Sequence, residues 1–174
     1  MRVMVVGATG MLGQAVADAL GARHEVVAVT RRTTPGVDIA DPASVRALYR
    51  TVGALDAVVS VTGAAAWKPL AELADEDFAI SLASKLMGQV NLVRYGLDAV
   101  RANGSFTLTS GILAQRPMPG SAAVSLVNAG LEGFVRAAAH AIPLDETFDL
   151  VIVDFELHSV DRAHLLRSAA EIDR

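Results

Sequence analysis

A run of four apolar residues, Val3–Val6, leads directly into the glycine-rich segment 7–13, which reads Gly-Ala-Thr-Gly-Met-Leu-Gly. An apolar run of this length is typical of a strand that a parallel sheet buries on both faces. The residues after the segment, from Met11 to about Leu20, follow helical periodicity. A strand, a glycine turn and a helix N-terminus in this order predict a phosphate-binding element, because unpaired backbone N–H groups face the ligand.

Each of the three glycines has a physical role in this interpretation. Gly7 lets the chain leave the strand in a tight turn, and Gly10 lets the backbone approach a pyrophosphate. Gly13 allows the helix to pack closely on the strand. The spacing GxxGxxG makes the turn one residue longer than in GxGxxG. A turn with a purely structural role is the alternative.

Strand-like and helix-like segments alternate along the whole chain. The second helix is expected to begin with Asp41 as its N-cap and Pro42 at its first position, and to end at Gly53. The predicted strands are Val3–Val6, Glu25–Val29, Asp56–Val61, Ser105–Thr109 and Phe148–Phe155. The other predicted helices are 75–102, 122–142 and 161–172. The alternation predicts one α/β domain over residues 1–174: a doubly wound, mostly parallel, Rossmann-like sheet of about six strands with helices on both faces.

Composition excludes several classes of function. A net charge of −4 does not favour nucleic-acid binding, and the absence of cysteine excludes disulfides and thiol catalysis. No apolar stretch approaches the roughly 20 residues of a membrane span, and the N-terminus does not have the pattern of a signal peptide. We therefore expect a cytoplasmic protein. The four histidines are scattered without metal-ligand spacing, so no metal site is predicted.

The end of the second predicted strand bears on cofactor choice. An NAD site usually carries an acidic residue about 20 residues after the glycines, where it binds the ribose hydroxyls. Here Arg31 and Arg32 follow the strand instead. A guanidinium suits a 2′-phosphate, so the sequence favours NADP(H) over NAD(H). Two solvated surface arginines are the alternative.

Several motifs in sequence order resemble the short-chain dehydrogenase/reductase family over roughly residues 1–155. They are the glycine segment, Val37-Asp38-Ile39, Val61-Thr62-Gly63, Leu108-Thr109-Ser110-Gly111-Ile112 and Asn128-Ala129-Gly130-Leu131-Glu132-Gly133-Phe134. The resemblance implies that Asp38 and Ile39 lie at the adenine, and that Thr62 and Gly63 border the ribose. The residues predicted to bind the cofactor are therefore Gly7, Thr9, Gly10, Met11, Leu12, Gly13, Arg31, Arg32, Asp38, Ile39, Thr62 and Gly63.

The catalytic pair of that family is a tyrosine followed four residues later by a lysine. One helical turn places both side chains on one face, and the tyrosine transfers a proton. In this chain Val124 stands at the tyrosine position and Asn128 at the lysine position. Valine cannot exchange a proton, whereas Asn128 can still bind a ribose hydroxyl. The tyrosines, Tyr49 and Tyr95, fall on earlier predicted helices.

Other departures from the family concern the nicotinamide and substrate half of the site. A helical asparagine of the family's proton relay is replaced by Lys85, and the Pro-Gly expected after the sixth strand is replaced by residues 154–157. The family's last strand and substrate loop are missing or replaced by the final helix. The sequence leaves open whether the unusual segment after about residue 143 is native or a truncation.

Three residues are the candidates for catalysis: Ser110, Lys85 and Asn128. Ser110 is expected at the carboxyl end of its strand, where ligands bind in such sheets. Lys85 is a candidate to replace the missing lysine, with a solvated helical lysine as the alternative. Trp67 lines the cleft or packs within its loop. Asp154 and Glu156 are expected to be surface residues at a strand end.

These features lead to two main hypotheses of function. The first is an NADPH-dependent oxidoreductase that acts on a small carbonyl or alcohol compound. The second is a catalytically inactive dinucleotide-binding or sensor protein that works through oligomerisation or a partner. A non-redox enzyme on the same scaffold is a third. The two long helices resemble those of the family's four-helix interfaces, so we predict a homodimer or homotetramer.

Overall fold

A computed structural model describes residues 1–141 and 149–153 of the chain. Their five strands form one sheet in the order β2-β1-β3-β4-β5, and all the strand pairs are parallel. The strands are β1 (Arg2–Val6), β2 (Glu25–Val29), β3 (Leu55–Ser60), β4 (Val100–Thr109) and β5 (Asp149–Val153). This doubly wound parallel sheet is the Rossmann-like fold that the sequence predicts, with five of the expected strands in the described part of the chain.

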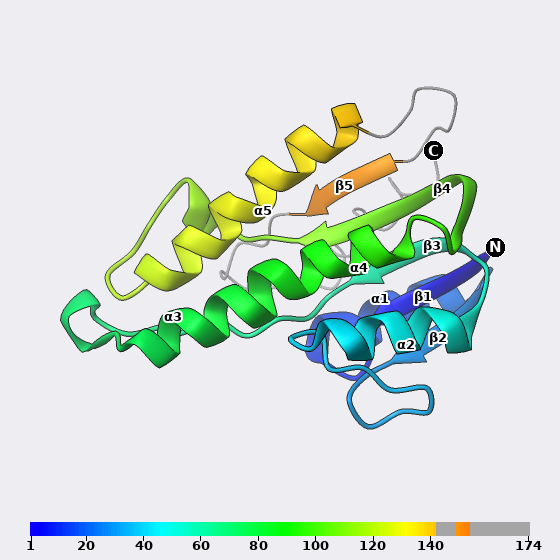
Figure 1. Cartoon of the computed structure of the whole chain (residues 1–174), viewed down its shortest axis with the longest axis horizontal. Coiled ribbons are helices and arrows are strands. Elements are labelled where there is room, and N and C mark those ends of the chain that lie inside the picture. The colour runs from blue at the N-terminus through cyan, green and yellow to red at the C-terminus, as the bar shows by residue number, and fades with distance from the viewer. Residues whose placement is uncertain (142–148, 154–174) are drawn as a thin grey trace.

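Helices cover both faces of the sheet (Figure 1). On one face α1 (Met11–Gly21) packs through Leu20 against Val3, Val5 and Val59. The other face carries α2 (Pro42–Val52), α4 (Gln89–Gly96) and α5 (Ala122–Ala141). The predicted N-cap is confirmed, because the Asp41 carboxylate accepts from the N–H of Ala43 at 2.9 Å.

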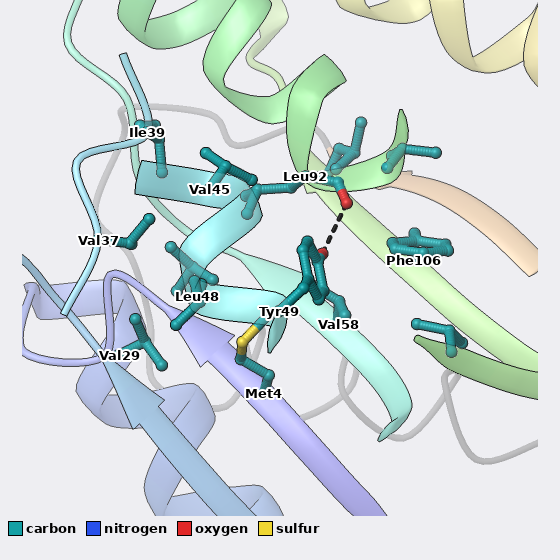
Figure 2. Close-up of a cluster of buried hydrophobic side chains, with 14 of the residues drawn as sticks. Met4, Val29, Val37, Ile39, Val45, Leu48, Tyr49, Val58, Leu92 and Phe106 are labelled. Atoms are coloured by element: carbon teal, nitrogen blue, oxygen red, sulfur yellow. Dashed lines mark hydrogen bonds between the residues drawn. The ribbon is translucent and has the colours of Figure 1, made fainter. Parts of the chain in front are cut away.

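The larger core lies between the sheet and the α2, α4 and α5 layer (Figure 2). Phe106 and Leu92 are fully buried, and the hydroxyl of Tyr49 donates to the carbonyl oxygen of Leu92 at 2.6 Å. Burial raises the pKa of Tyr49. This tyrosine thus holds α2 to α4 and lies within the core.

The predicted helical region from about Asp75 to Ala102 is confirmed as far as Gly96, and its predicted end at residue 102 is wrong. The segment divides into α3 (Asp75–Ser81), a π-helical turn (Leu82–Gly88) and α4, which ends at Gly96. β4 begins at Val100, so Asn103 and Gly104 belong to an irregular part of that strand. The register shifts there, because Leu55 pairs with Val100 and Ala57 pairs with Ser105. The Asn-Gly pair marks this irregularity of the strand, not a helix C-terminus.

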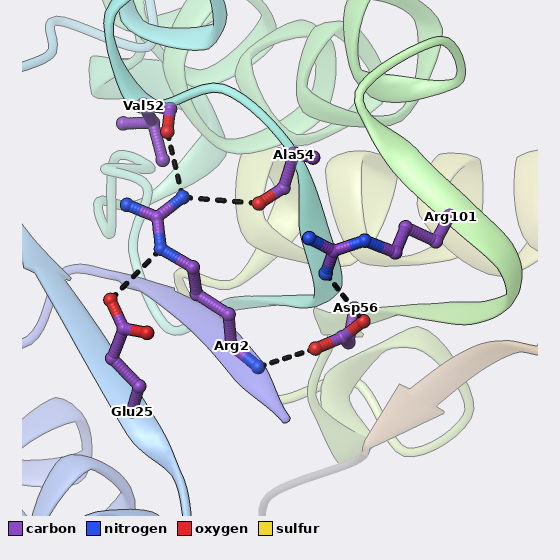
Figure 3. A network of polar contacts seen from close by, with 6 residues as sticks. All are labelled: Arg2, Glu25, Val52, Ala54, Asp56 and Arg101. Atoms are coloured by element: carbon purple, nitrogen blue, oxygen red, sulfur yellow. Dashed lines mark hydrogen bonds and ion pairs between the residues drawn. The ribbon is translucent and has the colours of Figure 1, made fainter.

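A network of hydrogen bonds and ion pairs connects the amino ends of the strands, at the edge of the sheet opposite the glycine turn (Figure 3). The Arg2 side chain bonds Glu25 at 2.9 Å and the carbonyl oxygens of Val52 and Ala54 at 2.7 and 3.0 Å. The carboxylate of Asp56 accepts from the backbone N–H of Arg2 and from Arg101. These hydrogen bonds hold the pKa of Asp56 below its ordinary value. The network therefore stabilises the sheet away from the candidate site.

The predicted helix over 161–172 lies outside the described residues, as do Asp154 and Glu156. The predicted helix 122–142 is confirmed as α5, which carries an ion pair between Glu132 and Arg136 at 3.8 Å. No helix among the described residues is long and apolar enough to cross a membrane.

Candidate active site and cofactor-binding cleft

A cleft of about 360 Å³ opens at the carboxyl ends of β1, β3 and β4. The strand order reverses at β1, since the chain passes to β2 on one side and to β3 on the other. Ligands of open α/β sheets bind at such a point. The cleft is lined by Leu12, Val61, Thr62, Gly63, Ala65, Trp67, Lys85, Thr109, Ser110, Gly111, Leu113, Val124 and Asn128.

The glycine turn follows β1 directly and is tightly packed. Gly7 has a φ of +93°, and a Cβ at this position would lie 2.6 Å from the carbonyl oxygen of Val61. A Cβ at Gly13 would lie 2.7 Å from the carbonyl carbon of Gly7. Gly10 is exposed and has no such neighbour, so its open face leaves room for a ligand. Gly7 and Gly13 thus lie in the close packing that the sequence predicts for them, and the approach of Gly10 to a pyrophosphate stays a prediction.

The N-terminus of α1 is free to receive an anion. Gly10 is its N-cap residue and supplies no side-chain cap, and the first turn holds no acidic residue. The first N–H groups and the positive end of the helix dipole therefore face the turn without a side-chain partner. This is the environment that a pyrophosphate group requires.

Lys85 reaches the cleft from the π-helical turn. Its Nζ donates to the carbonyl oxygen of Thr109 at 2.9 Å. Gly63, with a φ of +125°, lies directly against it, since a Cβ there would be 2.9 Å from the Cα of Lys85. Lys85 is therefore not a solvated helical lysine. Gln89 fixes the same strand end, because its amide bonds both the N–H and the carbonyl oxygen of Thr109.

The electrostatic state of Lys85 follows from its surroundings. Burial disfavours the charged ammonium and lowers the pKa of Lys85 to about 8. No described residue that lines the cleft carries a carboxylate. The amine therefore changes its charge close to neutral pH, and a ligand can approach it without displacing an acidic partner.

Ser110 and Asn128 also line the cleft and lie close to each other. The Ser110 hydroxyl lies 3.4 Å from the carbonyl oxygen of Asn128 and 3.4 Å from the carboxylate of Glu132. The Asn128 amide nitrogen donates to the carbonyl oxygen of Gly111 at 3.3 Å. Asn128 is only 2% exposed, and its buried Oδ1 has no hydrogen-bond partner among the described residues. A buried amide oxygen at the cleft that lacks a donor suits a ligand hydroxyl.

The position of the family's tyrosine is occupied by Val124, which lines the cleft. Tyr49 lies in the core, and Tyr95 accepts from Arg46 at 2.8 Å on the surface of α4. Neither is among the described residues of the cleft. Proton transfer by tyrosine is therefore not available at this site.

Of the predicted cofactor residues, the cleft includes Leu12, Thr62 and Gly63. Thr9 and Met11 are exposed on the turn, and Arg31, Arg32 and Asp38 are exposed beyond it. Ile39 is only 7% exposed and packs against Gly88 in the core, where a Cβ on the glycine would approach its Cδ1 to 2.8 Å. These placements leave the adenine contacts of Asp38 and Ile39 as a prediction.

Two polar residues of this site, Gln89 and Glu132, are not among the site residues that the sequence predicts. Gln89 lies one turn after Lys85, and that spacing could have indicated a shared direction toward β4. The carboxylate of Glu132 accepts from the amide of Gln115 at 3.0 Å and contacts Ser110. Among the described residues no cluster of three or more His, Cys, Asp or Glu could hold a metal ion.

A Rossmann-like sheet with a glycine turn at its switch point defines a dinucleotide-binding protein, and comparisons specify the class. Residues 5–144 match the family model described as enoyl-(acyl carrier protein) reductase. Hydroxynaphthalene reductase arp2 of Aspergillus fumigatus is 35% identical over 95 residues, which cover 55% of this chain and 35% of that protein. The match therefore spans about a third of that relative's length.

Solved structures agree with this assignment. The crystal structure of the protein lin1944 from Listeria innocua is 34% identical, with a TM-score of 0.89, covering 98% of this chain and 92% of that chain. A small-chain dehydrogenase in complex with NADPH is 25% identical, with a TM-score of 0.76, covering 81% and 64%. The chain belongs to the short-chain dehydrogenase/reductase family of oxidoreductases, which binds nicotinamide dinucleotides.

Proposed function

We propose that this protein is an NADPH-dependent oxidoreductase of a small carbonyl or alcohol compound, with Lys85 in place of the family's tyrosine. One observation carries the proposal: the Lys85 amine and Ser110 line the same cleft as Leu12 and Thr62 of the expected cofactor site. A proton donor and a hydroxyl are thereby available where a carbonyl group would lie beside the cofactor.

The residues present fit a nicotinamide dinucleotide. Gly7, Gly10 and Gly13 form a turn that side chains would fill, and the free N-terminus of α1 suits the pyrophosphate. The unpaired Oδ1 of Asn128 suits a ribose hydroxyl. In the proposed assignment the residues that hold the rest of the cofactor are Thr9, Met11, Leu12, Thr62, Gly63, Asp38 and Ile39, with Arg31 and Arg32 at the 2′-phosphate. The bound nicotinamide supplies the hydride.

The remaining chemistry is a proton transfer by this chain. Lys85 in its ammonium form donates a proton from Nζ to the carbonyl oxygen of the substrate, and its pKa of about 8 suits a donor near neutral pH. The 3.4 Å contacts of Ser110 are long, so its hydroxyl can turn toward that oxygen and orient it. Asn128 orients the ribose through Oδ1.

A second candidate function is dinucleotide binding without turnover. Val124 lines the cleft at the position where the family carries its proton-transferring tyrosine. In this case the chain would act as a sensor, through its oligomer or through a partner. The two functions share the cofactor site and differ in whether Lys85 and Ser110 act on a substrate.

Turnover of NADPH with a panel of aldehydes and ketones tests the proposal. We expect Lys85→Met to lower kcat by about 10²- to 10⁴-fold while the Kd of NADPH changes little. Arg50→Met is the control, because Arg50 is exposed on α2 and is not among the described residues that line the cleft. Tight NADPH binding without turnover of any carbonyl compound would favour the sensor instead.

We also propose a homodimer or homotetramer built on α5 and the helical region before it. Leu126 on α5 is 49% exposed, and Met87 and Ile80 are 39% and 53% exposed. Exposed apolar residues on neighbouring helices are typical of an interface. Light scattering should give a mass at least twice that of the chain, and Leu126→Glu should lower it to that of the monomer.

A further inference from the structure

Trp67 is the one tryptophan of the chain, and it lies at the cleft without being buried. Its side chain lines the cleft and 46% of the residue is exposed. The residue lies in the segment between β3 and the short helix Leu70–Glu72. A tryptophan normally buries most of its large apolar surface. A half-exposed indole in a cleft therefore offers a face to a ligand.

The indole is held in place by main-chain contacts. Gly120, with a φ of +84°, lies against the ring, since a Cβ there would be 2.9 Å from the indole Nε1. The N–H of Lys68 donates to the carbonyl oxygen of Gly120 at 3.1 Å, which joins this segment to the loop before α5. The Lys68 amine then pairs with Asp77 at 2.8 Å. The ring position is thus set before any ligand binds.

The other walls of the cleft are mostly apolar. Ala65, Leu113 and Val124 line it together with the indole, whereas Lys85 and Ser110 supply polar groups at the strand ends. A ligand that satisfies both parts has a carbonyl oxygen for Lys85 and Ser110 and an apolar body. No described lining residue has a carboxylate, so the cleft offers no partner to a cationic substrate.

We propose that Trp67 is a specificity-determining residue that selects substrates whose carbonyl group is attached to a flat aromatic or conjugated ring. Aromatic rings attract one another beyond the gain from buried area, whereas a saturated ring of similar size gains only from burial. The inference rests on the proposed function, because it concerns the substrate of the same site.

Binding of two matched ketones tests this selectivity without turnover. The protein is saturated with NADP⁺, and acetophenone or cyclohexyl methyl ketone is titrated by calorimetry and by Trp67 fluorescence. We expect acetophenone to bind on the order of 2- to 10-fold more tightly and to quench the fluorescence. Trp67→Phe should retain the preference, and Trp67→Leu should abolish it in the calorimetric titration.

Two further variants separate the role of the ring from general effects on the loop. Gly120→Ala should weaken the preference although the indole remains, because the added Cβ displaces it. Leu70→Ala should leave the preference unchanged, since Leu70 is 70% exposed and is not part of the cleft.

The outcomes distinguish this inference from the proposed function. Three results would overturn the selectivity while NADP⁺ binding still stands: equal affinities for the two ketones, no binding of either ketone, or a preference that persists in Trp67→Leu. Failure to bind NADP⁺ and NADPH would overturn both. The preference in the native protein, with its loss in Trp67→Leu, would support the inference.

Discussion

Replacing Lys85 by methionine should stabilise the protein while it removes the proposed catalytic acid. Burial lowers the pKa of this amine from its ordinary 10.5 to about 8, so keeping it charged at neutral pH opposes folding. A pKa difference of this size corresponds to about 3 kcal/mol. The variant also loses the hydrogen bond to the carbonyl oxygen of Thr109, and this loss costs about 1 kcal/mol. We therefore expect Lys85→Met to be more stable by about 2 kcal/mol near neutral pH.

The stability difference between Lys85→Met and the native protein should change with pH in one direction. Because the folded pKa is lower than the unfolded pKa, the unfolded chain binds more protons between about pH 8 and pH 10.5. The contribution of Lys85 to the free energy of unfolding of the native protein must therefore rise with pH across this window. From about pH 7 to about pH 9 this group alone contributes a rise of about 1.3 kcal/mol. The methionine variant lacks that contribution, so its advantage should shrink by the same amount.

Urea denaturation followed by circular dichroism measures the stability difference between the two proteins and its change with pH. The titration of all other groups cancels in this difference. Lys68→Met serves as the control, because Lys68 is exposed and should show no comparable gain. A stability difference between Lys85→Met and the native protein that does not change with pH would refute the reasoning. So would a lower stability of the variant at about pH 7.

Three further predictions concern the turn, the core and the cofactor. Gly13→Ala should lower the free energy of unfolding by about 2 kcal/mol or more in urea, because its Cβ would overlap the backbone of the turn, whereas Gly21→Ala in the same helix should stabilise by roughly 0.5 kcal/mol. Tyr49→Phe should cost about 1–3 kcal/mol in the same assay, because a buried carbonyl oxygen loses its donor. Arg31→Ala and Arg32→Ala should raise the Kd of NADPH more than that of NADH in calorimetric titrations, and equal changes for both cofactors would contradict the assignment.

The Rossmann-like fold could be predicted because its signals are local. The apolar run Val3–Val6, the glycine turn and the cap at Asp41 each act within a few residues. The division of the helix over 75–102 could not be predicted in the same way. Near its end, Gly96 packs against Tyr49 and Phe106, which are distant in sequence, and a Cβ on Gly96 would lie 2.6 Å from Cζ of Tyr49.

The candidate site shows the same limit. Ser110 and Asn128 could be placed by their spacing, because a strand end and the helix after it fix both positions. The burial of Lys85 could not, since it depends on Gly63 in the segment after β3 and on Thr109 at the end of β4. The same holds for the contact of Ser110 with Glu132, which joins residues 22 positions apart.

Titration of the purified protein with NADPH and NADH tests the central claim most directly. Trp67 is the sole tryptophan and lines the cleft, so energy transfer from its indole to a bound nicotinamide reports occupancy of the cleft itself. We expect saturable NADPH binding with quenched Trp67 emission and increased nicotinamide emission, and weaker binding of NADH. No heat of binding and no change in either emission would contradict it, because the glycine turn would then have a structural role alone.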